Sequence, residues 1–299
     1  MAVALAPSVI AMTTLLPSEA TEPGASGANR APPAAPIPTD VAPVRRAYWI
    51  LRIAAAACFV GHGAFGIITK AAWVPYFGVV GIPEHWAYRL MPVVGSIDIA
   101  AGVAVLFSPR PFVLSYMVVW AACTALLRPL AGESAFETIE RAGNYGVPLA
   151  LLLLFGWPSA AGWLRPLRVR LTNASPSAIA PLLAWTTALL LFGHGALAAI
   201  TAKPMLASHF AFAGLPRDAI TIAGWAEMIA AVLVVVGPSP PLLLTIVGWK
   251  VATEALYPLS GTPIWEFVER AGSYGAPLAL ALILIDSGSS HVTLRRSTR

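Results

Sequence analysis

The sequence is poor in charge. Only 11% of its 299 residues are charged, whereas 58% are hydrophobic and the mean hydropathy is +0.74. A water-soluble globular protein carries roughly 25% charged residues, so this chain has too little polar surface to cover a soluble body of its length. The scarcity of charge argues against an ordinary soluble enzyme and favours a protein that lies in a lipid bilayer.

Cysteine is scarce too, and the common cofactor motifs are missing. The two cysteines, Cys58 and Cys123, form no CxxC motif, which argues against a thiol–disulfide relay. The sequence contains no Walker loop, no dinucleotide-binding glycine fingerprint and no zinc-type cluster. No segment interleaves basic with aromatic residues. We therefore assign no metal-ligating residues and expect no nucleic-acid partner.

Apolar stretches recur along the chain between proline-rich breaks, each near the roughly 20 residues that cross a bilayer. Eight are apparent, at 47–69, 89–108, 111–128, 139–157, 179–201, 219–237, 240–257 and 267–286. The sequence thus predicts an all-α integral membrane protein with eight transmembrane helices. Outside them we predict a disordered Ala/Pro-rich tail, a cytoplasmic linker and a basic tail, over 1–46, 158–178 and 287–299.

The chain also repeats itself. GHGA occurs at 61–64 and 193–196, and ERAGNYGVPLAL at 140–151 is matched by ERAGSYGAPLAL at 269–280. We interpret this as a tandem duplication of a four-helix unit, over 47–157 and 179–286. Because each unit crosses the membrane an even number of times, both have the same orientation. We therefore expect two pseudo-symmetric four-helix bundles in parallel orientation.

Lysine and arginine predict the orientation in the membrane. With eight crossings, both termini and the central linker lie on one side, which holds 11 basic and 4 acidic residues. The other side holds 8 basic and 10 acidic residues. We therefore expect both termini in the cytoplasm and a location in a bacterial-type inner membrane, with the lipid bilayer as the main partner.

Polar residues within the predicted segments gather toward the outer side. At 1.5 Å per residue, His62 lies ~9 Å and Asp98 ~13 Å below the outer surface, and Arg128 closes the third segment. The second unit repeats a histidine and an acid at equivalent positions. A charge in hydrocarbon is costly unless it is paired or faces the bundle interior. The candidate catalytic residues are therefore His62, Asp98, Arg128, His194, Glu227 and Lys250.

Charged residues at the outer mouth of each unit, and tyrosines in its fourth segment, form a second set. The candidate substrate-binding residues are Glu137, Glu140, Arg141, Tyr145, Glu254, Glu266, Glu269, Arg270 and Tyr274. A simpler interpretation is that a glutamate in the first turn favours the helix dipole and that Gly143 and Gly272 allow tight packing. Trp73 and other tryptophans near segment ends are typical of an interfacial aromatic belt.

The two units are not identical. Ala121, Ala125 and Arg128 of the first align with Lys250, Glu254 and Tyr257 of the second. This indicates either two related sites or one working site and one structural relic. A purely structural role also stays open, in which the histidines bond to a neighbouring helix and the buried acids form ion pairs with Arg128 or Lys250.

The four-segment unit resembles the DoxX-like membrane proteins. The resemblance rests on a Gly-flanked polar residue in the first segment, an acid in the second, and a Gly/Pro-containing fourth segment after a charged loop, ERAGNYGVPLALLLL at 140–154. It covers 47–157 and 179–286, and the tandem unit departs from the usual single four-helix subunit. The resemblance implies a quinone-linked membrane oxidoreductase component with a redox partner subunit.

Our first hypothesis is therefore a redox-linked protein that binds a quinone, or another flat lipophilic molecule, in the outer half of the bundle. The histidines would exchange protons with a carbonyl group, the acids would orient them, and the basic residues would offset developing negative charge. One alternative is a haem or chlorin ligated by the two histidines. Another is a non-enzymatic transporter or an assembly subunit of a membrane complex.

Overall fold

The computed structural model describes the backbone of residues 41–154, 156–159, 162–167 and 176–297, and the side chains from residue 44 to residue 286 within these ranges. All of them belong to one of the two units into which the chain divides, residues 37–299. Every regular element in these ranges is helical, which confirms an all-α fold. The predicted tail lies outside the described residues up to residue 40, and so does part of the predicted linker.

The described helices form two successive series, which we call the first half (residues 41–154) and the second half (residues 176–286). The first comprises α1 (Val41–Ile67), the 3₁₀ helix η1 (Ala71–Trp73), α2 (Val74–Val79), α3 (Glu84–Phe107), α4 (Pro111–Leu130), α5 (Phe136–Glu140) and α6 (Ala142–Leu153). The second comprises α7 (Pro176–Ala199), α8 (Pro204–Phe212), α9 (Arg217–Val236), α10 (Pro240–Leu259), α11 (Trp265–Glu269) and α12 (Ala271–Ser297). The backbone of α12 thus stays helical into the predicted basic tail.

Proline and glycine set the ends of corresponding helices. Helices α4 and α10 begin at Pro111 and Pro240, where the missing N–H costs nothing and the fixed φ suits a first turn. Both helices are followed by a turn with a left-handed glycine, Gly132 at φ 93° and Gly261 at φ 98°. A side chain would be strained there, so the chain reverses direction at these points.

Six described helices are long and apolar enough to cross a membrane, namely α1, α3, α4, α7, α9 and α10. The structure therefore describes a multi-pass membrane protein. The two other predicted segments, 139–157 and 267–286, are each divided at an arginine into a five-residue helix and a second helix. Helix α6 has only 12 residues, or ~18 Å, which is shorter than the ~30 Å hydrocarbon core.

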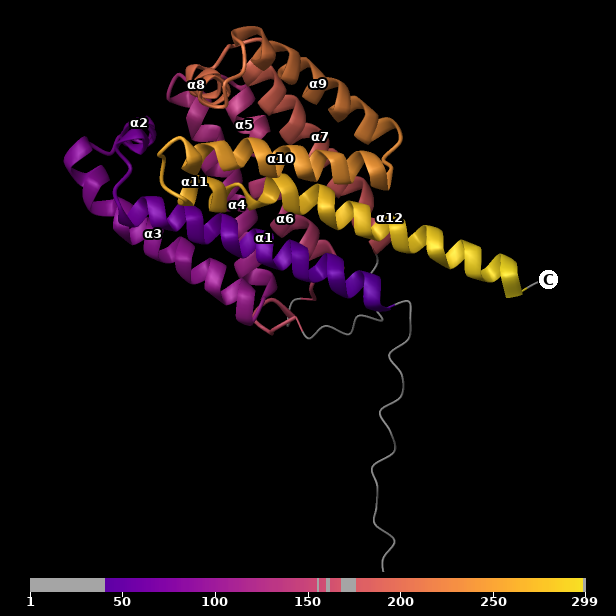
Figure 1. Cartoon of the computed structure of the whole chain (residues 1–299). Helices are drawn as coiled ribbons and strands as arrows, with labels where there is room; N and C mark the ends of the chain where they lie inside the picture. The colour runs from indigo at the N-terminus through magenta and orange to yellow at the C-terminus, as the bar shows by residue number, and fades with distance from the viewer. Residues whose placement is uncertain (1–40, 155, 160–161, 168–175, 298–299) are drawn as a thin grey trace, which may run out of the picture. The chain divides into compact units, whose positions relative to one another are not determined.

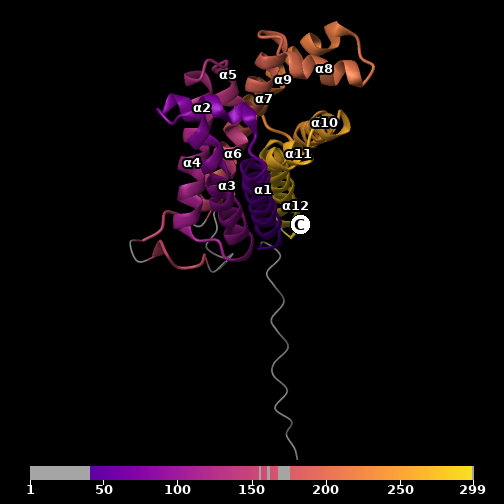
Figure 2. The ribbon, with the colours of Figure 1, turned by 90° about the vertical axis from the view of Figure 1, so that its left-hand side faces the viewer.

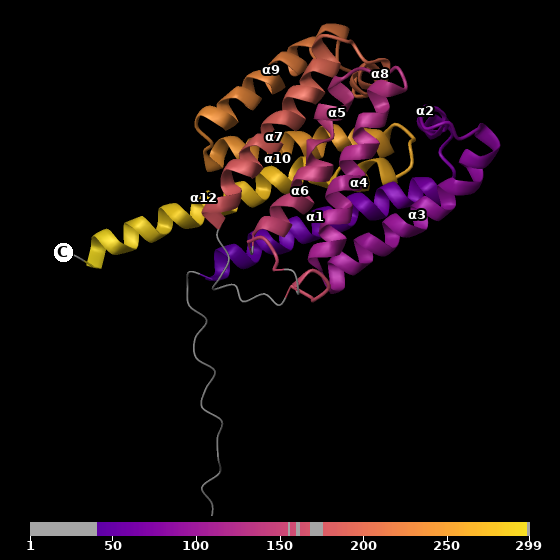
Figure 3. The ribbon, with the colours of Figure 1, turned by 180° about the vertical axis from the view of Figure 1, so that it is seen from behind.

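Helices α1, α6, α7 and α12 form the centre of the packed unit, and each contacts at least two of the others. Figures 1 and 3 show α1 beside α12 and α6 beside α7, and Figure 2 shows α1 between α3 and α12. About 70% of the apolar windows of α1 and α7 is buried, against 22–33% for α3, α4, α9 and α10. The last four helices are therefore the outer ones, whose apolar side chains are left for lipid.

Small residues let the inner helices approach closely. A Cβ atom built on Gly143 of α6 would lie 2.8 Å from the carbonyl carbon of Gly272 of α12. Between α1 and α3, a Cβ atom on Gly63 would lie 2.5 Å from the carbonyl oxygen of Gly95. Such contacts are typical of helix packing in membranes, and they bring side chains on neighbouring helices within hydrogen-bonding reach.

Candidate functional site

Each half contains a histidine that is hydrogen-bonded to an acid on the next long helix. His62 Nδ1 on α1 lies 2.8 Å from Asp98 Oδ2 on α3, and His194 Nδ1 on α7 lies 2.6 Å from Glu227 Oε2 on α9. Both acids are buried. The structure thus brings together, in each half, the two candidate catalytic residues that the sequence places on separate segments.

The second oxygen of each acid has a different partner in the two halves. The Tyr116 hydroxyl donates to Asp98 Oδ1 at 3.3 Å, whereas Trp249 Nε1 donates to Glu227 Oε1 at 2.5 Å. Trp120 aligns with Trp249, yet its buried Nε1 has no hydrogen-bond partner among the described residues. The first half therefore retains a free indole donor that the second half uses internally.

The ERAG segment of each half packs on the histidine helix of the other half. A Cβ atom on Gly61, the residue before His62, would lie 2.5 Å from the backbone nitrogen of Glu269. Gly193, the residue before His194, is packed as tightly against Glu140. Each histidine is therefore bordered by a charged segment from the opposite half.

Two lysines that the sequence reasoning missed tie the halves together. Lys70, between α1 and η1, bonds to Glu266 Oε1 of the second half at 2.6 Å, and Lys203, between α7 and α8, bonds to Glu137 Oε1 of the first half. These are reciprocal ion pairs. Because each lysine belongs to one half and each glutamate to the other, the pairs cross between the halves in both directions.

A sequence signal for these lysines exists. Both follow an Ile–Thr pair soon after GHGA, in IITK at 67–70 and ITAK at 200–203. The residue before each lysine, Thr69 or Ala202, has a positive φ, 53° and 46°, and these are the non-glycine residues with positive φ in the described chain. A non-glycine residue seldom adopts this conformation, so the turn that aims the lysine is a shared feature of both halves.

The glutamates at the predicted outer mouth are buried rather than solvated. Glu137 is 3% and Glu266 7% exposed. Glu137 Oε2 accepts hydrogen bonds from Arg141 at 2.9 Å and Arg128 at 3.4 Å, and Glu266 Oε2 accepts one from Arg270 at 2.5 Å. Arg141 and Arg270 of the ERAG segments thus do more than start a helix. Together with Glu137, Glu266 and the two lysines that cross between the halves, they form a set of ion pairs that we call the ionic layer.

Glu266 keeps its charge in this ionic layer. Burial alone raises the pKa of Glu266, but the charges of Arg270 and Lys70 outweigh it and lower the pKa to about 2. A buried carboxylate next to cations stays ionised at neutral pH.

The structural alternative predicts an ion pair between Asp98 and Arg128, but Arg128 pairs with other acids. Its Nη1 donates to Glu133 Oε2 at 2.9 Å, and its guanidinium lies 5.2 Å from the ring centre of Tyr76, whose hydroxyl also bonds to Glu133. Burial raises the pKa of Glu133, but the Tyr76 hydrogen bond and Arg128 lower it overall. Arg128 is therefore held by acids at one end of the site.

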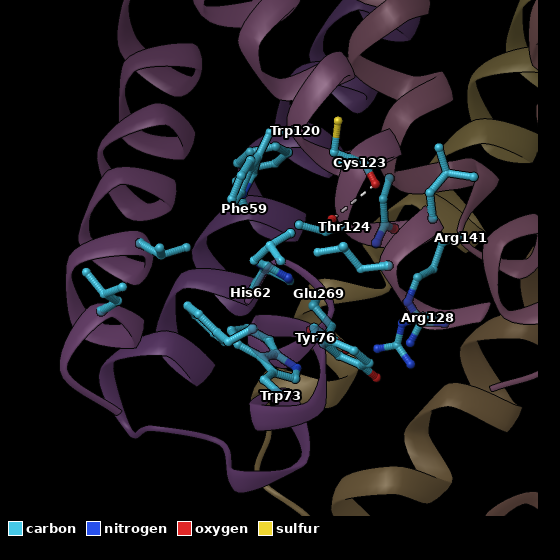
Figure 4. Close-up of a pocket in the computed structure, with 18 of the residues that line it drawn as sticks. Phe59, His62, Trp73, Tyr76, Trp120, Cys123, Thr124, Arg128, Arg141 and Glu269 are labelled. Atoms are coloured by element: carbon cyan, nitrogen blue, oxygen red, sulfur yellow. Dashed lines mark hydrogen bonds between the residues drawn. The ribbon is translucent and has the colours of Figure 1, made fainter. Parts of the chain in front are cut away.

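A cavity of about 580 Å³ lies beside His62. Its walls are mainly apolar and aromatic, and the polar groups include Arg128, Arg141, Asn144 and Glu269. Figure 4 shows His62 between Phe59 and Trp120 on one side and Trp73 on the other, with the two arginines at a common end. The cavity is thus an aromatic slot with a charged end.

Trp73 belongs to this slot and not to an interfacial belt. It is 7% exposed, and its ring is stacked on the His62 ring at 4.4 Å between centres. Both cysteines also contribute to the wall, Cys58 from α1 and Cys123 from α4, and both are free thiols. The spacing of these residues in the sequence did not indicate that they would meet at one cavity.

Part of the cavity wall lies on the exposed faces of the outer helices. Its rim includes Val93 of α3 and Leu126 and Leu130 of α4, and these side chains are 54%, 53% and 67% exposed. All three lie on segments that qualify as membrane spans. The cavity wall therefore extends to the exposed apolar faces of α3 and α4.

The corresponding place in the second half is filled. The cavity beside His194 measures about 10 Å³. Lys250 of α10 is 1% exposed and lies 3.0 Å from Glu254 and 3.8 Å from Glu227. Where the first half has the small side chain of Ala121, the second half thus has a buried lysine with its own acid partners.

The remaining candidates lie away from the cavity beside His62. Arg270 Nε is 3.0 Å from Glu254 Oε2, and its guanidinium covers the Tyr257 ring at 4.0 Å. The hydroxyls of Tyr145 and Tyr274 donate to backbone carbonyls of α5 and α11, at 3.3 and 3.0 Å. The two tyrosines therefore brace the bend before α6 and α12 in the described geometry.

The two histidines contribute to different cavities. Within the described ranges no group of three or more His, Cys, Asp and Glu side chains is placed to hold a metal ion. This geometry gives no support to a single haem held between His62 and His194. Comparison of the chain with protein-family models, with curated proteins and with solved structures finds no match.

Proposed function

We propose that this membrane protein binds a quinone, or a similar flat lipophilic molecule, in the cavity beside His62, as a redox-linked component of its membrane. The observation that carries the proposal is the cavity itself. Its volume, about 580 Å³, lies in the range of ~300–1,000 Å³ that is usual for small-molecule sites. It combines an aromatic wall, a lipid-facing mouth and a charged end.

The shape of the slot favours a flat ring system. Trp73 and Trp120 are both part of the wall, and aromatic rings gain most from stacked or edge-to-face contacts with other rings. An apolar tail can extend through the mouth between α3 and α4, where the exposed rim side chains are aliphatic. A quinone with an isoprenoid tail has both parts.

The polar residues supply what proton-coupled chemistry requires. Asp98 holds Nδ1 of His62, so the ring is oriented and its other nitrogen is available to a ligand. Arg128 and Arg141 at the charged end would stabilise negative charge that develops on a ligand oxygen. These are the roles of our first hypothesis from the sequence, and membership of the DoxX-like family is part of the proposal.

We further propose that the two halves are pseudo-symmetric bundles from a tandem duplication. In this proposal α6 and α12 complete a fourth crossing in each half. Both are apolar, over Ala142–Leu153 and Ala271–Asp286. The bias of basic residues to one side supports cytoplasmic termini in a bacterial-type inner membrane.

The direct test is to purify the full chain in mild detergent from its native membrane and to analyse an organic extract by mass spectrometry. We expect about one quinone per chain, lost in His62→Ala and retained in Val119→Ala, whose side chain is 61% exposed on α4. Extraction of phospholipid alone, or of haem, would contradict the proposal, as would quinone retained by His62→Ala.

A further inference from the structure

The hydrogen bond between His62 and Asp98 determines what the cavity offers a ligand. With Asp98 ionised and the His62 ring neutral, Nδ1 of His62, which lies 2.8 Å from Asp98 Oδ2, carries the hydrogen, because a carboxylate only accepts hydrogen bonds. In the neutral ring the other nitrogen, Nε2, is then an acceptor. Nε2 has no hydrogen-bond partner among the described residues, and His62 is part of the cavity wall.

A second acceptor comes from the other half of the molecule. Glu269 of α11 also contributes to the wall, and its backbone packs directly on Gly61, the residue before His62. Its Oε1 accepts a hydrogen bond from Arg270 Nη1 at 3.1 Å, and Oε2 has no partner within the described part of the chain. Figure 4 shows Glu269 next to the His62 ring.

The two side chains do not bond to each other, since no ion pair within 4.0 Å joins them in the described structure. Nδ1 of His62 is bonded to Asp98 and Oε1 of Glu269 to Arg270, and neither partner is part of the cavity wall. Nε2 of His62 and Oε2 of Glu269 remain without a partner in the described structure. The nearby arginines direct Nη1 to Glu133, Glu137 and Glu140. Nε2 of His62 and Oε2 of Glu269 are thus acceptors that a ligand hydroxyl can satisfy, beside the donors that Asn144 and Trp120 supply in the same wall.

We propose that the cavity prefers the reduced, hydroxyl-bearing form of its ligand, a quinol, and that Glu269 of the second half determines this specificity together with His62. A quinol hydroxyl can donate to Nε2 of His62 or Oε2 of Glu269, whereas a quinone carbonyl can only accept. A hydroxyl oxygen also accepts, which suits the unpartnered Nε1 of Trp120 in the same wall. The inference rests on the proposed function and adds the redox state of the ligand.

The test measures equilibrium binding of decylubiquinol and decylubiquinone to the full chain in lipid nanodiscs under anaerobic conditions, by quenching of tryptophan fluorescence. We expect the quinol to bind about tenfold more tightly, as two additional hydrogen bonds allow. Equal or tighter binding of the quinone would overturn the inference. This comparison needs no variant, so it does not depend on whether a substituted chain folds.

The variant Glu269→Gln locates the preference. Its amide can donate to a carbonyl as well as accept, so we expect the ratio of the two affinities to fall severalfold, toward one. Glu84→Gln, which removes an exposed carboxylate in the first turn of α3, should keep the wild-type ratio. An unchanged ratio in Glu269→Gln would overturn the role of Glu269. Failure of both probes to bind the wild-type chain would instead refute the proposed function.

Discussion

The two halves contain the same histidine–acid pair, yet a cavity of about 580 Å³ lies beside His62 and one of about 10 Å³ beside His194. One difference between the halves lies on α4 and α10. Where α4 has Ala121 in the cavity wall, α10 has Lys250, which is almost fully buried. Similar histidine–acid pairs therefore lie beside an open cavity in one half and beside buried charged side chains in the other.

The filled half still contributes to the open one. In the second half a series of charges runs from Glu227 through Lys250, Glu254 and Arg270 to Glu269, with separations of 3.8, 3.0, 3.0 and 3.1 Å. Its last member is part of the wall of the first half's cavity. The second half thus contributes one residue to the wall of the open cavity.

Filling the open cavity should give the largest effect. Ala121→Trp places a ring in the slot, and we expect binding of decylubiquinol to weaken more than about 100-fold, because ring stacking and the hydrogen bonds are lost together. The matched control is Val119→Trp on the exposed face of α4, which should bind normally. Normal binding by a folded Ala121→Trp chain would show that the ligand site lies elsewhere.

Replacing the acid by its amide in each histidine–acid pair should weaken ligand binding in the first half and lower stability in the second. Asp98→Asn presents an amide hydrogen to Nδ1 of His62 and inverts the ring's donor and acceptor, so we expect about tenfold weaker quinol binding in a chain of normal abundance. Glu227→Gln leaves the buried Lys250 short of a partner, and we expect about 3 kcal/mol lower stability.

Thermal unfolding followed by fluorescence, together with the binding assay, distinguishes the two outcomes. Loss of folding in Asp98→Asn would support a purely structural role for the His62–Asp98 pair. A folded and stable Glu227→Gln chain would contradict the stabilising role of Glu227 in the second half.

Removing the charged side chains beside His194 should open a second ligand site. Lys250→Ala combined with Glu254→Ala removes a buried ion pair whose atoms are 3.0 Å apart and recreates the residues that the first half has at these positions. We expect the number of decylubiquinol molecules bound per chain to rise from about one toward two, by equilibrium dialysis. A single bound molecule in the folded double variant would mean that other side chains also close the second site.

Local features of this fold could be predicted from the sequence. The long outer helices follow from apolar length, and the pairs His62–Asp98 and His194–Glu227 follow from repetition of polar residues in apolar segments. These predictions succeed because hydropathy and the cost of a lone charge in lipid act at each position separately.

The contacts between the halves could not be predicted in this way. That Glu269 borders His62 and that Lys70 bonds to Glu266 depends on how α1, α6, α7 and α12 pack, and no single segment encodes it. The alignment of Ala121 with Lys250 was visible, but its consequence was not, because a cavity depends on the volumes of all side chains around it. The sequence predicts Trp73 at the membrane interface, and its burial against His62 could not be predicted for the same reason.

The ionic layer that joins the halves should give the smallest effect, and acid reveals it. The pKa of Glu266 is about 2 in the folded chain, below the ordinary value near 4.3 of a free glutamate. A lowered pKa contributes stability above the ordinary value, and this contribution is lost as pH falls through the folded pKa. We therefore expect the unfolding temperature to drop by several degrees as the pH falls from about 4.5 to about 2, within the usual shift for ~1–2 kcal/mol.

Glu266→Gln should show a smaller drop than Glu84→Gln, which retains the layer. Equal drops in the two variants would mean that other groups cause the acid sensitivity. The ion pair between Lys70 and Glu266 would then not stabilise the contact between the two halves.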